Sequence, residues 1–231
     1  STAPDVRLSS VEASAAAESA FPEGDTINRS KMKTSRQELM QIYRRLHRHY
    51  GDLRWWPGES PLEISVGAIL TQNTAWTNVE KAIKRLKEAR SLSVTALGRM
   101  THRRLSLLIR SAGYFNVKAR RLKNFISFLQ ERYGGSLRKM FNQEPLRLRE
   151  ELLSVNGIGP ETADSILLYA GGKPLFVIDA YTKRILSRHG VLPYEESYDE
   201  FQKLFVKQLP RNGTLYNQYH AMFVNIGKDF C

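Results

Sequence analysis

Apolar residues recur at intervals of three and four positions along most of the chain after residue 33. This spacing places apolar side chains on one face of a helix, and short links containing Gly, Pro or Asn separate the runs. Alternation with a period of two, which indicates strands, is scarce, so the chain is predicted to be all-α. The expected helices lie at about 34–50, 61–71, 76–89, 93–98, 101–111, 115–133, 136–140, 145–154, 160–170, 178–189, 197–209 and 214–226.

The first 33 residues lack this periodicity and are rich in Ala, Ser and Glu. A segment of this composition buries too little apolar surface to offset the entropy of ordering it. Residues 1–33 are therefore predicted to be a disordered extension. Met32 directly precedes the first expected helix and is a candidate for the native start.

The charge of the chain indicates the class of its partner. Lys and Arg number 35 against 23 Asp and Glu, which gives a net charge of +12. Residues 1–33 carry −1, which leaves +13 on the remainder, and the stretch from Arg99 to Lys123 holds eight bases and no acid. Such a field attracts phosphate backbones, so a nucleic acid is the expected partner. The alternative is a solvated basic surface that serves only solubility.

The rest of the composition is typical of a globular protein of a reducing compartment. The longest apolar runs are shorter than the roughly 18 residues that cross a bilayer, so no membrane is expected. The single cysteine, Cys231, rules out an intramolecular disulfide. Together with nucleic-acid binding, this predicts a cytoplasmic, nucleoid-associated location in a bacterium or a nuclear one in a eukaryote.

The stretch "LREELLSVNGIGPETADSILLYA" is typical of a helix–hairpin–helix over about 146–170. Gly157 and Gly159 permit a tight turn and a close approach, and Pro160 suits the first position of a helix. Backbone amides at Glu161 and Thr162 would face an anion at the positive end of the helix dipole. The hairpin is thus predicted to hold a DNA phosphate, with Lys118 and Arg121 as further phosphate contacts. The alternative is an ordinary packing corner between two helices.

A lone carboxylate, Asp179, follows the apolar run Phe176-Val177-Ile178. One interpretation is a helix N-cap before Ala180. The segment "GIGPETADSILLYAGGKPLFVIDAYTKRI" also resembles the helix–hairpin–helix DNA glycosylases of the endonuclease III superfamily. The resemblance continues through "PLEISVGAILTQNTAWTNVEKAIKRL", "AGYFNVKARRLKNF" and "YNQYHAMFVNIGKDFC", and so covers most of residues 40–231.

This resemblance implies a two-lobed helical fold with a cleft between the lobes. The central lobe is expected at about 55–160, and the second lobe at 34–54 plus 161–231. It also implies that Asp179 is catalytic, where it stabilises positive charge on the sugar and activates the nucleophile. Physical chemistry agrees, because a desolvated carboxylate acts strongly on developing oxocarbenium charge and can orient a water. The implied partner is double-stranded DNA with a damaged base, bound by a monomer.

Glu161 stands where bifunctional members of that superfamily carry the lysine that forms a Schiff base with the sugar. A carboxylate cannot form an imine, so attack by water is expected instead. The resemblance therefore implies a monofunctional glycosylase, one that leaves an abasic site without cutting the strand.

A glycosylase has to extrude its target nucleotide and stack the base in a pocket. Gln72 matches the glutamine that enters the duplex in the superfamily, with Asn73 beside it; the alternative is a polar helix end. "RWWPGESP" offers Trp56, Trp55 and Pro57 as a base pocket, which resembles the 3-methyladenine (MagIII-like) branch. A cationic N-alkylated purine is attracted to an indole face. The alternative for the two tryptophans is a core plug.

Cys231 lies where iron–sulphur members of the superfamily have the first of four cluster cysteines. No metal or cofactor is expected on this chain as given, because the three partner cysteines are missing. A 4Fe-4S cluster would require further sequence beyond Cys231. Two other functions stay open: an endonuclease III-like glycosylase for oxidised or mismatched pyrimidines, and a non-enzymatic helix–hairpin–helix DNA-binding module with Asp179 only as a cap.

Overall fold

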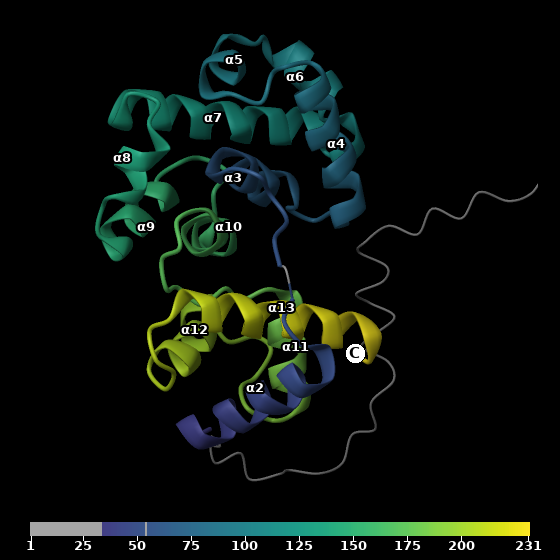
Figure 1. Cartoon of the computed structure of the whole chain (residues 1–231), viewed down its shortest axis with the longest axis vertical. Helices are drawn as coiled ribbons and strands as arrows, with labels where there is room; N and C mark the ends of the chain where they lie inside the picture. Colours follow the sequence, from purple (N-terminus) through teal and green to yellow (C-terminus); the bar gives the residue numbers. More distant parts are fainter. Residues whose placement is uncertain (1–33, 54) are drawn as a thin grey trace, which may run out of the picture. The chain divides into compact units, whose positions relative to one another are not determined.

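The described residues, 34–53 and 55–231 of a computed structural model, form helices joined by turns and contain no strand (Figure 1). The predicted all-α class is confirmed. The predicted disordered extension 1–33, the candidate start Met32 and Arg54 lie outside the described residues. The helices are α2 (Arg36–Tyr50), α3 (Pro61–Leu70), α4 (Trp76–Glu88), α5 (Val94–Arg99), α6 (His102–Leu108), η2 (Arg110–Ala112), α7 (Phe115–Tyr133), α8 (Leu137–Phe141), α9 (Pro145–Leu153), α10 (Pro160–Ser165), η3 (Ile166–Ala170), α11 (Ala180–Arg188), α12 (Tyr198–Val206) and α13 (Gly213–Asp229).

Polar residues set where most of these helices begin. The Ser35 hydroxyl accepts the Glu38 N–H, and the Glu38 carboxylate accepts the Ser35 N–H at 2.7 Å, which forms a capping box for α2. Ser60 caps α3, and Pro61 occupies its first position, where no amide is wasted. Side-chain caps also precede α5, α6, α8, α9, α12 and α13, at Ser93, Thr101, Ser136, Glu144, Ser197 and Asn212.

Two expected helices change character along their length. The helix predicted at 101–111 is divided into α6 and the short 3₁₀ turn η2. The helix predicted at 160–170 begins as α10 and continues as η3, a stretch of π-helix. A π-helical turn is rare and occurs often at functional sites.

The first hydrophobic cluster surrounds α7, which contacts α3, α5, α6, α8 and η2. Figure 1 shows α7 running below α5 and α6. The buried side chains of α7 recur every three or four residues, as the sequence pattern predicts. Nearly all of α3 is buried, since its run of apolar residues packs against both α7 and η3. Within the described ranges, no helix has both the length and the apolarity needed to cross a membrane.

The second hydrophobic cluster is built from α2, α11, α12 and α13 around the apolar segment that precedes Asp179. Phe176 of that segment stacks on Phe205, with ring centroids 3.9 Å apart and planes nearly parallel. Tyr219 of α13 meets both rings edge-on. The packing of Phe176 holds the chain that leads to Asp179 inside this cluster.

The two hydrophobic clusters share the segment that runs from α10 to Phe176. Ala163, Ile166, Leu167 and Leu175 belong to the first cluster, whereas Leu168 and Phe176 belong to the second. α10 packs on α3 of the first cluster, and the predicted division of the lobes at about 160 stays a prediction. The chain therefore contributes to both clusters between η3 and Phe176.

Candidate nucleic-acid interface and catalytic carboxylate

The turn between α9 and α10 lines a hollow of about 550 Å³. Every hairpin residue from Gly157 to Thr162 contributes to its wall, together with Gln72, Arg121 and Tyr198. The structure thus brings together the predicted hairpin residues, the predicted duplex wedge and one predicted phosphate contact. Tyr198, which starts α12, was not predicted from the sequence.

Hydrogen bonds hold Gln72 against the hairpin. Its side-chain amide donates to the Gly157 carbonyl at 3.0 Å and to the Thr162 hydroxyl at 2.9 Å. Its amide oxygen accepts from Arg121 Nη1 at 2.5 Å. Asn73, next in the chain, is exposed and adopts a left-handed backbone with φ +52°. The wedge role of Gln72 and Asn73 stays a prediction, and their place at the end of α3 also fits the alternative of a polar helix terminus.

Gly157 and Gly159 of the hairpin differ in why a glycine suits the position. Gly157 has φ +96°, and a Cβ there would lie 2.2 Å from Arg121 Cγ. Only glycine therefore lets Arg121 pack onto the turn. Gly159 has an ordinary φ of −94°, and a Cβ there would meet no protein atom within 4 Å. Packing within the described protein does not require glycine at 159, and the start of α10 is open to a ligand.

The prediction that Lys118 contacts phosphate is wrong. Its side chain is only 1% exposed, and Nζ donates to the carbonyls of Leu70 and Ala112 at 2.8 and 2.7 Å. Burial, followed by the charge of Arg121, lowers the pKa of Lys118 to about 8. The helical period places Lys118 on the inner face of α7, so an exposed lysine was the wrong expectation from charge alone.

Asp179 is both the N-cap of α11 and a nearly buried carboxylate. Its Oδ1 accepts the Thr182 N–H at 2.7 Å and the Thr182 hydroxyl at 2.8 Å. Its Oδ2 lies 3.6 Å from Nε2 of His220, and the side chain is 13% exposed. Burial opposes ionisation, but the neighbouring His220 and the Thr182 hydrogen bonds outweigh it and lower the pKa of Asp179. The N-cap interpretation is confirmed. The cap uses only Oδ1, so Oδ2 can interact with a bound substrate.

An aromatic chain extends from Asp179 to the tryptophans. The other nitrogen of His220, Nδ1, lies 2.6 Å from the Tyr169 hydroxyl. The Tyr169 ring stacks on Trp56, with centroids 4.7 Å apart and an angle of 11° between planes. Trp56 also meets Trp76 edge-on at 5.3 Å. Tyr169 and His220 were not predicted as site residues; the one available signal was a histidine within the apolar stretch of α13.

The two candidate pocket tryptophans pack at different points of this chain. Trp55 meets His220 edge-on at 6.3 Å, and Lys228 Nζ lies 5.8 Å from its ring centre. Trp56 has a left-handed φ of +60° and packs on the first cluster. Pro57 is exposed. Tyr169 covers one face of the Trp56 ring, so that face is packed as the core alternative predicts. A flipped base could contact only the parts of the ring that Tyr169 leaves uncovered.

Glu161 is exposed at the wall of the hairpin hollow. Desolvation, followed by repulsion from Asp179, raises the pKa of Glu161 to about 7, and the charge of His220 opposes this rise. Glu161 therefore changes between acid and carboxylate near neutral pH. It supplies no amine.

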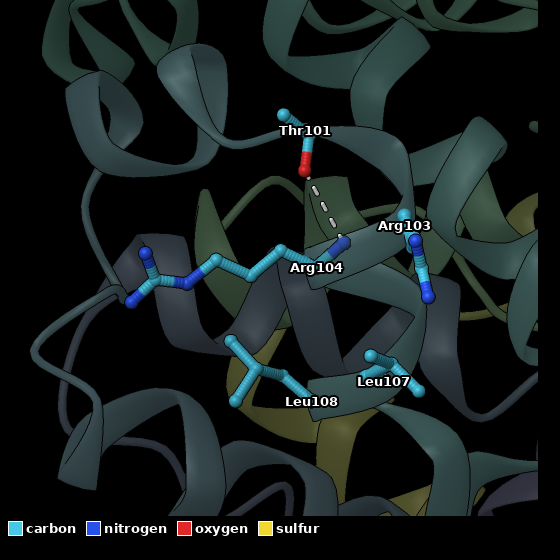
Figure 2. A pocket seen from close by; sticks show the side chains of 5 residues that line it. All are labelled: Thr101, Arg103, Arg104, Leu107 and Leu108. Carbon is cyan, nitrogen blue, oxygen red and sulfur yellow. Dashed lines mark hydrogen bonds between the residues drawn. The ribbon is translucent and has the colours of Figure 1, made fainter.

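A second hollow, of about 440 Å³, lies on α6 (Figure 2). Its lining consists of Thr101, Arg103, Arg104, Leu107 and Leu108. The Thr101 hydroxyl accepts the Arg104 N–H at 3.3 Å and so caps the helix, while the two arginine side chains extend in different directions. With two cations and no acid, this hollow belongs to the basic stretch from Arg99 to Lys123 and resembles no catalytic site.

Within residues 34–53 and 55–231, no three His, Cys, Asp or Glu side chains gather where they could hold a metal ion. Cys231 is a free cysteine, half-buried, and its thiol lies 3.1 Å from Arg188 Nη1. The prediction about an iron–sulphur cluster depends on sequence beyond Cys231 and stays a prediction.

The helices and the hairpin match a known family over most of the chain. Residues 66–211 match the model of the HhH-GPD superfamily of base excision DNA repair proteins. The chain belongs to this superfamily. A candidate DNA repair glycosylase of Methanocaldococcus jannaschii is 47% identical over 202 residues, which are 87% of this chain and 92% of that protein. Endonuclease III of Thermotoga maritima is 29% identical over 74% of this chain and 75% of its own length.

Solved structures agree with this assignment to the HhH-GPD superfamily. The H. pylori 3-methyladenine DNA glycosylase MagIII, bound to 1,N6-ethenoadenine, has a TM-score of 0.75 and 27% identity, over 85% of this chain and 99% of that one. An endonuclease III–DNA complex has a TM-score of 0.73 and 22% identity, over 85% and 87%, and supports the fold. This HhH-GPD protein is therefore a DNA glycosylase, and DNA is its partner.

Proposed function

We propose that this DNA glycosylase is monofunctional and hydrolyses the N-glycosidic bond of N-alkylated purines such as 3-methyladenine. One observation carries the catalytic part of the proposal. Asp179 is nearly buried, yet its pKa is lowered, so its carboxylate is ionised at neutral pH. Only Oδ1 takes part in the cap of α11, and Oδ2 does not. A desolvated, ionised carboxylate is the group that this reaction requires.

In the proposed reaction, the bond between C1′ of deoxyribose and the base nitrogen breaks, and its electron pair leaves with the base. Positive charge develops on the sugar, and the Asp179 carboxylate stabilises it. A water oxygen then bonds to C1′, and its proton passes to solvent by way of Asp179. An N-alkylated purine is already cationic, so it leaves as a neutral base without a strong general acid.

The proposed absence of lyase activity follows from the side chain of Glu161. The residue lies in the hairpin hollow, and its charge interacts with that of Asp179, yet its carboxyl group cannot form an imine with the sugar. The pKa of about 7 leaves Glu161 as an acid or a carboxylate, neither of which is a nucleophile toward an aldehyde carbon.

We expect the wild-type protein to release a base without nicking the strand until alkali is added. Borohydride should trap no protein–DNA adduct, because only an imine is reduced to a stable link. Glu161→Lys serves as the matched variant, since it restores an amine at the same backbone position. A borohydride-trapped adduct with the wild-type protein would contradict the monofunctional assignment.

The aromatic chain supports the choice of alkylated purines. The chain of contacts begins at Trp56, which stacks on Tyr169. The Tyr169 hydroxyl is hydrogen-bonded to His220, and His220 lies beside the charge of Asp179. Electron-rich rings this close to the carboxylate suit a cationic base, which indole attracts best. The likeness to MagIII at 27% identity adds support from a protein named for 3-methyladenine.

Trp56→Ala is expected to slow excision of 3-methyladenine by about one to three decades, because stacking and cation–π attraction are lost together. Excision of a neutral lesion such as uracil should fall less. Single-turnover rates on the two lesions, with a melting curve, make the test. Trp76→Ala is the control, since it removes an indole that meets Trp56 but not Tyr169. Equal losses on both lesions with a lower melting temperature would identify Trp56 as a core plug.

Oxidised pyrimidines are the second candidate substrate, favoured by the 29% identity to endonuclease III of Thermotoga maritima. The same excision assay separates the two candidates when duplexes carrying thymine glycol are included. Release of the oxidised pyrimidine, with 3-methyladenine left intact, would replace the alkylpurine proposal.

A further inference from the structure

Two loops leave the first hydrophobic cluster from neighbouring helix ends. α3 ends at Leu70, and the loop Thr71–Asn73 follows with Gln72 at its centre. η2 ends at Ala112, and Gly113 and Tyr114 lead into α7. Lys118 of α7 joins the two ends, because its Nζ donates to the carbonyl of Leu70 and to that of Ala112.

The link is strong for a physical reason. The last carbonyls of a helix have no partner within the helix, and the negative end of the helix dipole favours a cation there. One ammonium satisfies an end carbonyl of each element at 2.8 and 2.7 Å. The side chain is 1% exposed, so water cannot replace it. Removing the ammonium would leave two buried acceptors without a donor, a costly arrangement.

Both loops carry backbone strain close to the link. Asn73 and Tyr114 are non-glycine residues with left-handed φ values of +52° and +43°. Such conformations persist only where the surrounding structure imposes them, and they are common at functional sites. Tyr114 is 68% exposed, so packing of its own ring does not hold it there. The carbonyls that Lys118 anchors just before each loop are one constraint common to both loops, and the hydrogen bonds of Gln72 to the hairpin are a second constraint on the first loop.

We propose that Lys118 is a positioning residue for base extrusion, which fixes the Gln72 loop and the Gly113–Tyr114 loop relative to each other. The idea rests on the proposed entry of Gln72 into the duplex. With the link intact, Gln72 is presented at the hairpin hollow in one orientation. Without it, the glycosylase still holds DNA and still has Asp179, but it extrudes a paired base slowly.

The test compares one lesion in two settings. 3-Methyladenine is placed opposite thymine, where it has to be extruded, or in a one-nucleotide bulge, where extrusion costs less. Lys118→Met keeps an unbranched side chain that is one atom shorter and removes the donor. We expect it to slow single-turnover excision of the paired lesion about 30-fold, while the bulged lesion is excised within about threefold of the wild-type rate.

The matched control is Lys123→Met on the same helix. Lys123 Nζ also donates to end carbonyls, those of Leu97, Gly98 and Met100, but these belong to the end of α5. It should change both rates alike. The ratio is taken within each variant, so a partly unfolded preparation leaves it unchanged. Lys118→Gln, which keeps an N–H₂ donor group on a shorter side chain, replaces Lys118→Met if the latter does not fold, and should give a smaller change of the same sign.

A fluorescent readout keeps this test separate from the substrate assignment. 2-Aminopurine beside the paired lesion brightens when the stack opens, whether or not the bond is cut. Slower brightening in Lys118→Met, with the wild-type rate in Lys123→Met, supports the proposal. An unchanged paired-to-bulged ratio in Lys118→Met, or an equal change in Lys123→Met, overturns it. A wild-type protein that opens the stack but releases no 3-methyladenine contradicts the proposed substrate alone.

Discussion

Asp179→Asn should reduce single-turnover base excision by about 10³-fold or more, because the charge that stabilises the sugar cation is lost. Asparagine keeps an oxygen where Oδ1 accepts from Thr182, so α11 should retain its cap and the protein its fold. Affinity for duplex DNA should stay equal or rise, since a negative charge near the phosphates is removed. Rapid-quench excision and a binding titration, made on the same lesion duplex, measure the two quantities.

The control is Asp199→Asn, which neutralises a carboxylate that is 62% exposed and lies on α12. Its excision rate should stay close to that of the wild type. An Asp179→Asn rate within tenfold of wild type would remove Asp179 from the mechanism. It would leave Asp179 as a helix cap in a site that works by another group.

Arg149→Met is expected to lower the free energy of unfolding by about 3–5 kcal/mol. Asp164 is fully buried, and Arg149 donates to its two oxygens from Nε at 2.7 Å and Nη2 at 3.2 Å. Gln202 donates to the same carboxylate at 2.7 Å and to the Phe176 carbonyl. The variant leaves the buried Asp164 carboxylate without its cationic partner at the point where α9, α10 and α12 meet. Urea unfolding followed by far-UV circular dichroism measures the loss.

Lys203→Met supplies the comparison for this ion pair. Lys203 and Glu200 form a pair on α12 in which both side chains are about half exposed. Exposed pairs contribute about 0–1 kcal/mol, so this variant should unfold almost as the wild type does. A loss in Arg149→Met no larger than that in Lys203→Met would mean that Asp164 stays hydrated or protonated at little cost.

The sequence alone predicted the helices well, because each depends on local information. Apolar spacing and caps such as Ser60 before Pro61 mark an element without reference to the rest of the chain. The hairpin was predictable for the same reason, since Gly157, Gly159 and Pro160 are adjacent. The family motif then placed Asp179 at the start of a helix, where the structure has it.

Partners that are distant in sequence were not predictable in the same way. His220 reaches Asp179 across 41 positions, and Tyr169 reaches His220 across 51, so neither pairing leaves a periodic trace. Lys118 was misjudged because a count of charges ignores which face of a helix a residue occupies. Arg121, three positions later on the same helix, does line the hairpin hollow.

The π-helical segment η3 has a consequence for how sequences of this kind can change. A π turn is what remains when one residue is inserted into an α-helix, and it shifts every later side chain by about 100° around the axis. Ile166 and Leu167 serve one hydrophobic cluster, and Leu168 and Tyr169 serve the other. Deleting a single residue here would restore a regular helix but turn Tyr169 away from both His220 and Trp56. The extra residue thus sets the rotation at which Leu168 and Tyr169 face the second cluster while Ile166 and Leu167 face the first.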